Sequence, residues 1–334
     1  MTSTERLTLS EARALINAAL IAQGVAADSA AAVATALVAA QAEGQSGHGF
    51  SRLGDYAAQA RSGKVNPNAQ ITLHEASPTS VIVDADAGFA YPALDAAIEW
   101  GIERANSYGT AVMSVHHSHH CGALSVQVEK LAKQGLIGLM MANSPPAIAP
   151  WGTAKPVFGT NPIAFAAPRL DGVPLVIDLS LSRVARGKIM NAKKTGQSIP
   201  EGWALDANGH ATTDPDAALA GSMIAAGEAK GTVLALMVEI LAAVFTGANA
   251  SADVSSFFTS DGPPPGAGQF LMAIRPNDAD GFADRLEAVL SAIMALEGSR
   301  LPGDRRAKAL RESEANGIDV PKQYVDLARE LARG

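Results

Sequence analysis

The sequence predicts an α/β protein, and three observations support this prediction. Two helical segments come before any convincing strand, and from Thr79 onward short β-branched runs alternate with amphipathic segments. No G-x-G-x-x-G motif follows a predicted strand, and the nearest glycine cluster, at 44–49, follows a helix and has the reverse spacing. The alternation by itself favours a doubly wound parallel sheet. Without the fingerprint, we expect any dinucleotide to be bound in a different way.

The first two elements are helices. Thr8-Leu9-Ser10-Glu11 has the spacing of a capping box, and Gly24 ends the helical pattern that follows it. Asp28-Ser29 can cap a second helix, which we expect to continue to Glu43. The chain therefore begins with helices rather than with a strand.

Strands and further helices alternate after these two helices. We expect strands at residues 80–84, 110–115, 136–142, 163–167, 175–179 and 270–274. We expect helices at residues 124–133, 231–245, 282–296, 304–316 and 324–332, and another whose first turn contains Pro92. Asp171-Gly172 between two apolar runs predicts an antiparallel hairpin.

Composition excludes several classes of protein. The chain has 334 residues, of which 48% are hydrophobic and 18% charged, so it is long and apolar enough to fold around a large core. Its net charge of −7 disfavours binding to nucleic acid or to anionic lipid. The single cysteine, Cys121, and the lack of a signal-peptide pattern predict a cytoplasmic protein. The longest apolar run, 232–245, contains Glu239 and is shorter than the roughly 20 residues of a membrane span, so it predicts a buried helix.

Four of the seven histidines lie in one segment, at 116–120. One hypothesis is a metal site formed by His117, His119 and Cys121, which would point to one side of an extended strand. A second is a polar strand end with solvated imidazoles. A third is a catalytic or cofactor-contacting role, because a strand that leads through Gly122 into a helix exposes backbone N–H groups suited to a phosphate.

His48 and Arg52 form a second candidate site. Glycines flank His48, and Arg52 follows four positions later, so the two side chains share a face if a helix restarts here. This spacing suits a 2-oxo or 2-hydroxy acid, with Arg52 binding the carboxylate and His48 exchanging a proton with the neighbouring oxygen. A capped turn with an exposed histidine and arginine is the alternative.

Weaker signals occur elsewhere in the chain. They are the turn 159–162, the strand end 178–182, Lys230 before an apolar helix, and Arg305 and Arg306 at a helix start. Cations are unfavourable at a helix N-terminus, so an anionic partner would explain the two arginines.

Taken in order, several segments resemble the type 2 malate/L-lactate dehydrogenase family, which includes ureidoglycolate and sulfolactate dehydrogenases and reductases of cyclic imino acids. The matching segments are Ala142-Asn143-Ser144-Pro145, Gly159-Thr160-Asn161-Pro162, Val184-Ala185-Arg186-Gly187-Lys188, Ile199-Pro200-Glu201-Gly202-Trp203-Ala204-Leu205-Asp206 and Thr213-Asp214-Pro215. The resemblance covers nearly the whole chain.

The resemblance implies a fold different from the one that alternation favours. It implies a mostly antiparallel, non-Rossmann sheet that binds a nicotinamide cofactor, beside a separate helical domain, in a homodimer. The helical domain would comprise residues 1–75 joined by the returning helices of 277–334, and the NAD(P)-binding domain residues 76–276.

The resemblance also implies roles for individual residues. His48 would be the catalytic acid/base and His120 a second candidate for proton transfer, while Arg52 and Thr160 would contact the substrate. The residues expected to face the cofactor are His120, Cys121, Gly122, Ala123, Leu124, Asp178, Leu179, Ser180, Lys230, Pro302, Gly303, Asp304, Arg305 and Arg306, within a loop that runs to Lys308.

Three segments depart from the patterns of the family. Gly47 replaces the serine that usually precedes the catalytic histidine, and Arg186-Gly187-Lys188 replaces the His-Gly-Asp of the imino-acid reductases, so their Ser-His-Asp relay cannot form. Arg-Gly-Lys is typical of the hydroxy-acid branches, and Arg186 and Lys188 suit an anionic substrate. Lys230 lacks the usual paired glycines before it.

The leading hypothesis is therefore hydride transfer between NAD(P)H and a small 2-oxo or 2-hydroxy acid of the malate, lactate or sulfolactate type. The alternative is an NADPH-dependent reductase of cyclic imino acids of the pyrroline- or piperideine-2-carboxylate type. A third hypothesis is a non-catalytic or metal-binding protein. NADP is the expected cofactor, with NAD possible, because adjacent Arg305 and Arg306 suit a 2′-phosphate. No metal is expected.

Overall fold

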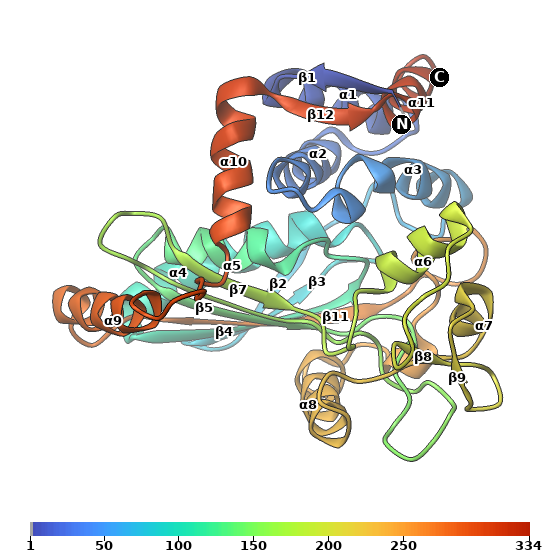
Figure 1. Cartoon of the computed structure of the whole chain (residues 1–334). Helices are drawn as coiled ribbons and strands as arrows, with labels where there is room; N and C mark the ends of the chain where they lie inside the picture. Colours follow the sequence, from blue (N-terminus) through green and yellow to red (C-terminus); the bar gives the residue numbers. More distant parts are fainter. Residues whose placement is uncertain (1–2) are drawn as a thin grey trace.

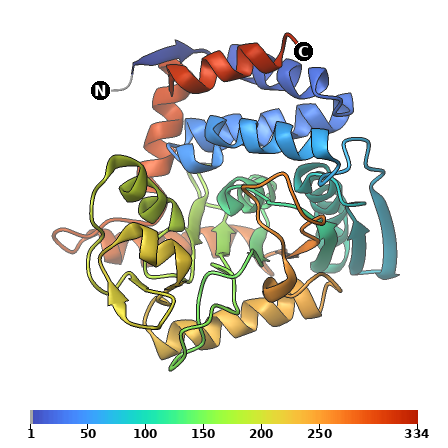
Figure 2. The same ribbon diagram turned by 90° about the vertical axis from the view of Figure 1, so that its right-hand side faces the viewer.

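The structure of the protein is a computed structural model that describes residues 3–334. A seven-stranded sheet lies at its centre, with a helical layer on one side and α8 on the other (Figures 1 and 2). The order of the strands is β2-β3-β4-β11-β5-β6-β7. Their bounds are Thr72–Ser77 (β2), Ser80–Asp84 (β3), Thr110–Ser118 (β4), Ile137–Ala142 (β5), Ile163–Ala167 (β6), Leu175–Leu179 (β7) and Ala267–Ile274 (β11).

The sheet is mixed, which corrects both sequence-based expectations about its topology. β3 and β4 run parallel because α4 (Ala90–Tyr108) connects them as a crossover helix. The pairs β2–β3, β4–β11, β11–β5, β5–β6 and β6–β7 are antiparallel. The doubly wound parallel sheet is therefore wrong, and the mostly antiparallel sheet is corrected to a mixed one. The predicted hairpin at Asp171-Gly172 is confirmed between β6 and β7.

The helical layer contains both ends of the chain. It consists of β1 (Thr4–Leu7), α1 (Leu9–Ala22), α2 (Ala27–Ala42), α3 (Leu53–Ser62), β12 (Ile318–Pro321) and α11 (Lys322–Leu331). β1 and β12 pair antiparallel, so the first and last segments lie side by side (Figure 1).

The predicted N-terminal caps of α1 and α2 can be compared with the structure. Thr8 and Glu11 form the predicted capping box at the start of α1. The predicted cap of α2 is wrong, because α2 begins at Ala27 after Ala26, without a side-chain cap. Asp28 lies inside the first turn, where its negative charge still interacts favourably with the helix dipole.

Two helices connect the helical layer and the sheet. α5 (Leu124–Ala132) lies on the face of the sheet that is turned toward the helical layer, and α10 (Asp304–Asn316) runs from the sheet up to that layer (Figure 1). α9 (Ala279–Met294) packs near the far end of the sheet, where Leu290 contacts Leu175 and Leu301.

α8 (Ala229–Glu239) continues into the π-helical turn η3 (Ile240–Val244) on the opposite face of the sheet (Figure 2). The predicted helix is present, but it is not buried as expected. Ala235 and Val238 pack against the sheet, whereas Val233 and Val244 are 68% and 70% exposed. Among residues 3–334, no helix has both the length and the apolar character that crossing a membrane requires.

A small lobe with no counterpart among the predicted elements lies at the right of Figure 1. It contains α6 (Arg186–Thr195), α7 (Pro215–Ala220) and the short strands β8 (Ala204–Leu205), β9 (Ala211–Thr212) and β10 (Ser222–Met223), which form a three-stranded sheet. Strands of two residues are too short for a periodic pattern to predict.

Candidate active site

His48 and His120 meet where the helical layer faces the sheet. His48 ends the 3₁₀ turn η1 (Ser46–His48) after α2, and His120 lies two residues beyond the end of β4. Their rings are stacked, with centroids 5.4 Å apart and planes 16° apart. Burial, and secondarily the charge of Arg52, lowers the pKa of His48 to about 4 and holds the pKa of His120 well below its usual range. Both imidazoles are therefore neutral near pH 7.

Arg52 supplies a fixed positive charge beside these rings. It lies in the 3₁₀ turn η2 (Phe50–Arg52), where its Nε donates a hydrogen bond to the Gly47 carbonyl at 2.8 Å. Its guanidinium lies 4.4 Å from the centroid of the Phe258 ring, and its Nη1 is 3.9 Å from an Asp55 carboxylate oxygen. Since Gly47 takes the Nε–H group, the terminal nitrogens are the atoms of Arg52 that can bind an anionic ligand.

Two buried tyrosines orient His120. The Tyr56 hydroxyl is 2.6 Å from His120 Nδ1 and 3.0 Å from the Tyr91 hydroxyl. Burial raises the pKa of both tyrosines, so both keep their protons. We assign Tyr91 as the donor to Tyr56 and Tyr56 as the donor to His120 Nδ1, which leaves the ring proton on His120 Nε2. Tyr56 was not predicted from the sequence, although it follows Arg52 by one helical turn.

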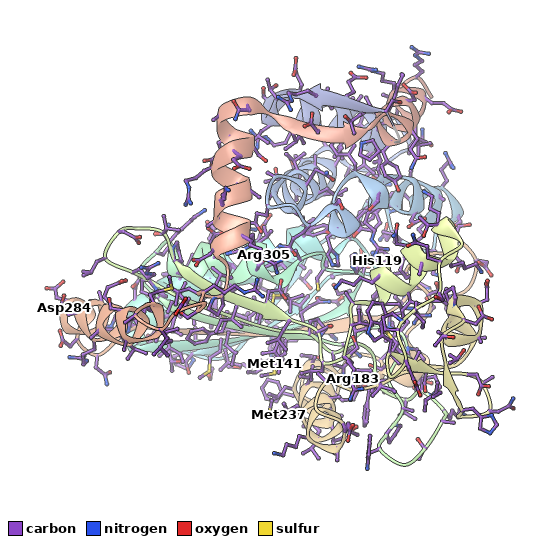
Figure 3. The ribbon with its side chains drawn as sticks, in the orientation of Figure 1. His119, Met141, Arg183, Met237, Asp284 and Arg305 are labelled. Carbon is purple, nitrogen blue, oxygen red and sulfur yellow. The ribbon has the colours of Figure 1, made fainter. Side chains whose placement is uncertain are left out.

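His119 is part of the packing beneath the site. It is labelled in Figure 3. Its side chain is 1% exposed, and its Nε2 lies 2.5 Å from Gln59 Oε1. Burial lowers its pKa to about 3. The metal hypothesis that combined His117, His119 and Cys121 is wrong. His117 has a φ of +46° near an irregularity in the β4–β11 pairing, so the alternation of the strand breaks and His117 contacts Asp84 instead.

Thr160 belongs to a second group of contacts. The Thr160 N–H group donates to Ser144 Oγ at 3.0 Å, and the two hydroxyls are 3.3 Å apart. Arg186 donates to the Pro146 carbonyl at 3.3 Å, so Thr160 and Arg186 bind the same loop. Burial lowers the pKa of Arg186, which is the first residue of α6, whereas Lys188 is exposed.

A buried network fixes the residue after Thr160. Asn161 has a φ of +39°, and its side-chain nitrogen donates to the Ala235 carbonyl at 3.0 Å and to Glu239 at 2.9 Å. Glu239 also accepts hydrogen bonds from the backbone and the hydroxyl of Ser251. Glu239, which interrupts the apolar run of α8, therefore has a structural role: it accepts hydrogen bonds from Asn161 and Ser251.

The predicted cofactor-facing segments gather at the end of β7. Residues 121–124 are buried, and the N–H group of Ser125, at the start of α5, donates to an Asp178 carboxylate oxygen at 2.8 Å. This hydrogen bond joins the start of α5 to the end of β7. Asp178 is exposed, and desolvation raises its pKa. Leu179, next to it, is 46% exposed.

The loop before α10 packs against β7. Gly303 has a φ of +86°, and a Cβ there would lie 2.8 Å from the Val176 carbonyl, so this position requires glycine. The Arg306 guanidinium lies 3.2 Å from Glu43 and 3.7 Å from Glu129. Arg306 is therefore paired with two protein carboxylates.

Two of the predicted cofactor-facing cations are exposed. Arg305 lies at the lower end of α10 (Figure 3). Lys230 lies in the first turn of α8. Neither position is buried against carboxylates in the way that Arg306 is.

Comparison with known proteins gives the class of the protein, an oxidoreductase of small acids. The paired imidazoles beside an arginine are consistent with this class. The chain belongs to the malate/L-lactate dehydrogenase family, which matches residues 7–327. The family predicted from the sequence motifs is thus confirmed.

The similar proteins differ from one another in their activities. The chain is 48% identical over 327 residues to a (2R)-3-sulfolactate dehydrogenase (NADP(+)) of Chromohalobacter salexigens, covering 98% of each chain. It is 37% identical to a Δ1-pyrroline-2-carboxylate/Δ1-piperideine-2-carboxylate reductase of Pseudomonas putida, covering 98% of this chain and 96% of the relative. The crystal structure of a Δ1-piperideine-2-carboxylate reductase from Pseudomonas syringae superposes with a TM-score of 0.93 at 36% identity, covering 98% of this chain and all of the other.

Proposed function

We propose that the protein is an NADP(H)-dependent oxidoreductase that interconverts a small 2-hydroxy acid and its 2-oxo acid, with sulfolactate-type acids as the preferred class. The observation that supports this most directly is the placement of Arg52 beside the neutral imidazoles of His48 and His120. The 48% identity to an NADP(+)-dependent sulfolactate dehydrogenase supports the choice of acid and cofactor.

The residues at the end of β7 fit a dinucleotide. Asp178 offers an exposed carboxylate for ribose hydroxyls, and exposed Leu179 offers an apolar surface for a ring. A cavity formed by α5, the β6–β7 hairpin and α10 has Glu129, Val173 and Arg306 among its lining residues. We therefore propose that the segments 120–124, 178–180 and 302–306, with Lys230, hold the cofactor. When bound, its nicotinamide accepts or supplies the hydride.

The roles of the protein residues follow from their geometry. Arg52 binds the substrate carboxylate with its terminal nitrogens and orients the neighbouring carbon. His48, whose Nδ1 is buried without a hydrogen-bond partner, accepts the hydroxyl proton during oxidation of the hydroxy acid and returns it during reduction. His120, held by Tyr56, donates its Nε2–H to the same substrate oxygen and remains the second candidate for proton transfer.

We propose that Arg186 and Lys188 bind a second anionic group of the substrate, with Thr160 beside it. α6 begins at Arg186, and the loop that binds Arg186 also holds Thr160. A sulfonate or second carboxylate on the methyl carbon of the acid would meet these cations. This arrangement favours dianionic acids over lactate.

A panel of substrates tests the proposed function. The purified protein would be mixed with NADPH and, separately, 3-sulfopyruvate, oxaloacetate, pyruvate or Δ1-piperideine-2-carboxylate, and the loss of NADPH absorbance measured. Each turnover of a 2-oxo acid consumes one NADPH and one proton and yields the hydroxy acid and NADP⁺. We expect the highest kcat/KM with 3-sulfopyruvate. Turnover of the cyclic imine alone would overturn the proposal in favour of the alternative.

The alternative is the reduction of a cyclic imino acid. The 37% identity to the Pseudomonas putida reductase and the superposition on the Pseudomonas syringae enzyme favour it. The presence of Gly47 and Lys188 at the two positions of the expected relay counts against it.

We further propose a homodimer, a cytoplasmic location and two domains, 1–75 with 277–334 and 76–276. The exposed apolar residues of α8 and η3 support the dimer, because an isolated surface of this kind is unfavourable in water. The buried free thiol of Cys121 supports the location. Separate cores, one within the helical layer and one between the sheet and its helices α4 and α5, support the two domains.

A further inference from the structure

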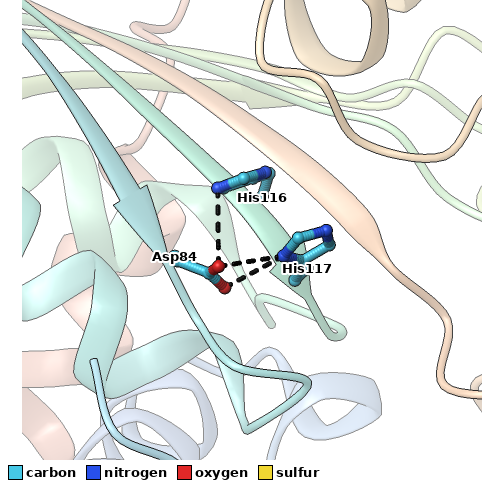
Figure 4. A group of neighbouring side chains, drawn as sticks. All are labelled: Asp84, His116 and His117. Atoms are coloured by element: carbon cyan, nitrogen blue, oxygen red, sulfur yellow. Dashed lines mark hydrogen bonds and ion pairs between the residues drawn. The ribbon is translucent and has the colours of Figure 1, made fainter. Parts of the chain in front are cut away.

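Asp84, His116 and His117 form a compact cluster that the proposed function does not use. His117 Nδ1 is 3.0 Å from each Asp84 carboxylate oxygen, and His116 Nε2 is 3.9 Å from Asp84 Oδ2 (Figure 4). The two imidazole rings are stacked, with centroids 4.2 Å apart. One potential ligand atom from each residue lies within 4.8 Å of the other two.

The backbone of the two parallel strands creates this cluster. Asp84 ends β3 and is the register partner of His116 on β4. His117 would point to the other face in a regular strand, but its φ of +46° brings it onto Asp84. Asp86 and Ala87, in the turn after β3, also have positive φ angles, of +50° and +55°. Such conformations are unfavourable for residues other than glycine and concentrate at functional positions.

The turn after β3 is fastened to the histidine segment. The Ala85 N–H group donates to the His116 carbonyl at 3.1 Å, and the Ala87 N–H group donates to the His117 carbonyl at 2.9 Å. The Asp86 N–H group donates to Asp84 Oδ1 at 2.8 Å. The hydrogen bond from Asp86 to Oδ1 thus orients the carboxylate, and its Oδ2 faces both imidazoles.

We propose that Asp84, His116 and His117 bind a divalent transition-metal ion of the zinc type, with water completing the coordination. Two imidazoles and one carboxylate are a ligand set that zinc accepts together with an open position. In a tetrahedral zinc site the ligand atoms are separated by roughly 3.4 Å, and the present separations of 3.0 and 3.9 Å lie on either side of that value. The Asp86 N–H group acts as the partner that orients the metal-binding carboxylate.

This cluster is distinct from the candidate active site formed by His48, Arg52 and His120. His119 and His120 follow on the same segment, but they are bound to Gln59 and Tyr56. In contrast, the side chains of Asp84, His116 and His117 are 36%, 20% and 56% exposed, so an ion can reach them from solvent. Zinc binding here therefore does not depend on the proposed function, and its failure would leave that function untouched.

Zinc titration of the full-length, chelator-treated protein tests the proposal. Isothermal calorimetry with zinc chloride at neutral pH should show saturable binding of one zinc ion per chain. His117→Gln and, separately, His116→Gln should weaken this binding at least tenfold. His210→Gln is the matched control, because His210 forms another histidine–aspartate pair, 3.7 Å from Asp206, that has no third potential ligand among residues 3–334. It should bind zinc like the wild type.

Thermal unfolding gives a second readout. Zinc that binds only the folded chain raises its Tm, and this increase should be lost in His117→Gln and kept in His210→Gln. Circular dichroism would establish that each variant is folded. Absence of saturable zinc binding in the wild type would overturn the proposal. Undiminished binding in both His116→Gln and His117→Gln would do the same, because the ion would then be bound elsewhere.

Discussion

The proposed role of Arg52 depends on a hydrogen bond that fixes its side chain. Its Nε is bonded to the Gly47 carbonyl, so the planar guanidinium is held with its terminal nitrogens available. Arg52→Lys keeps the charge but loses both the attachment and the two-pronged geometry. We expect KM for the 2-oxo acid to rise roughly 10- to 100-fold, the range for loss of a charge-assisted hydrogen bond, with KM for NADPH unchanged.

Steady-state kinetics on both substrates would measure this effect. Arg13→Lys, an exposed arginine on α1, is the control and should behave as wild type. An unchanged KM for the acid in Arg52→Lys would remove Arg52 from the substrate site.

His48 and His120 can be separated by truncation. His48→Ala removes the proposed base, so kcat should fall roughly 10²- to 10⁴-fold, the usual range for a positioned acid/base. Tyr56→Phe leaves His48 in place and removes only the hydrogen bond to His120 Nδ1, so a smaller loss is expected. If His120→Ala is more damaging than His48→Ala while cofactor affinity is intact, the two roles are exchanged.

The lowered pKa of His48 has a consequence for the pH profile. In the free enzyme the pKa is about 4, so the imidazole is already the neutral base throughout pH 5 to 8. As pH falls, the base form is lost only near pH 4, not near the unshifted pKa of about 6.5. The value of kcat/KM for oxidation of the hydroxy acid should therefore be nearly flat from pH 8 to 5. A tenfold decline per pH unit below 6.5 would contradict the assigned burial of His48.

The sequence predicted the neighbours of a candidate residue only where a local pattern reports them. The spacing of His48 and Arg52 was sufficient to pair them, because both lie on consecutive 3₁₀ turns. The orientation of His119 depends on Gln59, and that of His120 on Tyr56, which are about 60 residues away in sequence. No spacing rule can report such contacts. The crowding of histidines was visible, but its division between a buried pair and an exposed pair depends on the φ of His117.

At the scale of elements, the start of α10 places two adjacent arginines in different surroundings. Arg306 is bound to Glu43 and Glu129, whereas Arg305 is exposed at the helix start. Arg305→Ala should therefore weaken NADPH binding about tenfold and NADH binding little. Only NADPH has a 2′-phosphate, which would lose its charge-assisted hydrogen bond with the Arg305 guanidinium. Fluorescence titration of both reduced cofactors would measure the two affinities.

Arg306→Ala serves as the comparison for this prediction. Burial already raises the pKa of Glu43 to about 7, and removal of Arg306 would leave that carboxyl without its cation. The variant should mainly lower Tm rather than discriminate between cofactors. Equal loss of NADPH and NADH affinity in Arg305→Ala would exclude Arg305 from recognition of the 2′-phosphate.

Element boundaries were predictable where the pattern is local and strong. β3, β6, β7 and α10 have the predicted bounds, because their apolar runs end at clear turn or cap signals. The pairing of β1 with β12 was missed, since it joins segments more than 300 residues apart in sequence. The direction of neighbouring strands also depends on such distant pairing, which is why alternation suggested the wrong sheet.

At the scale of the whole molecule, α8 and η3 connect the surface to the candidate site. Their outer face exposes Val233, Val244 and Phe245, while Glu239 on the inner side holds Asn161 next to Thr160. Burial of the outer face in a homodimer would remove apolar surface from water and steady this helix. The apolar composition that predicted a buried helix is then explained by a partner subunit.

A charge placed on this face should therefore separate the subunits. We expect light scattering of the wild type to give twice the chain mass of 34.2 kDa, and of Val244→Asp to give the mass of one chain. Leu170→Asp, at a 62% exposed position in the β6–β7 hairpin, is the control and should remain dimeric. Because Glu239 is fixed by the same helix, Val244→Asp should also lower kcat, whereas Leu170→Asp should not. A wild-type chain that is monomeric at all concentrations would refute the dimer and leave the exposed face of α8 without a partner of its own kind.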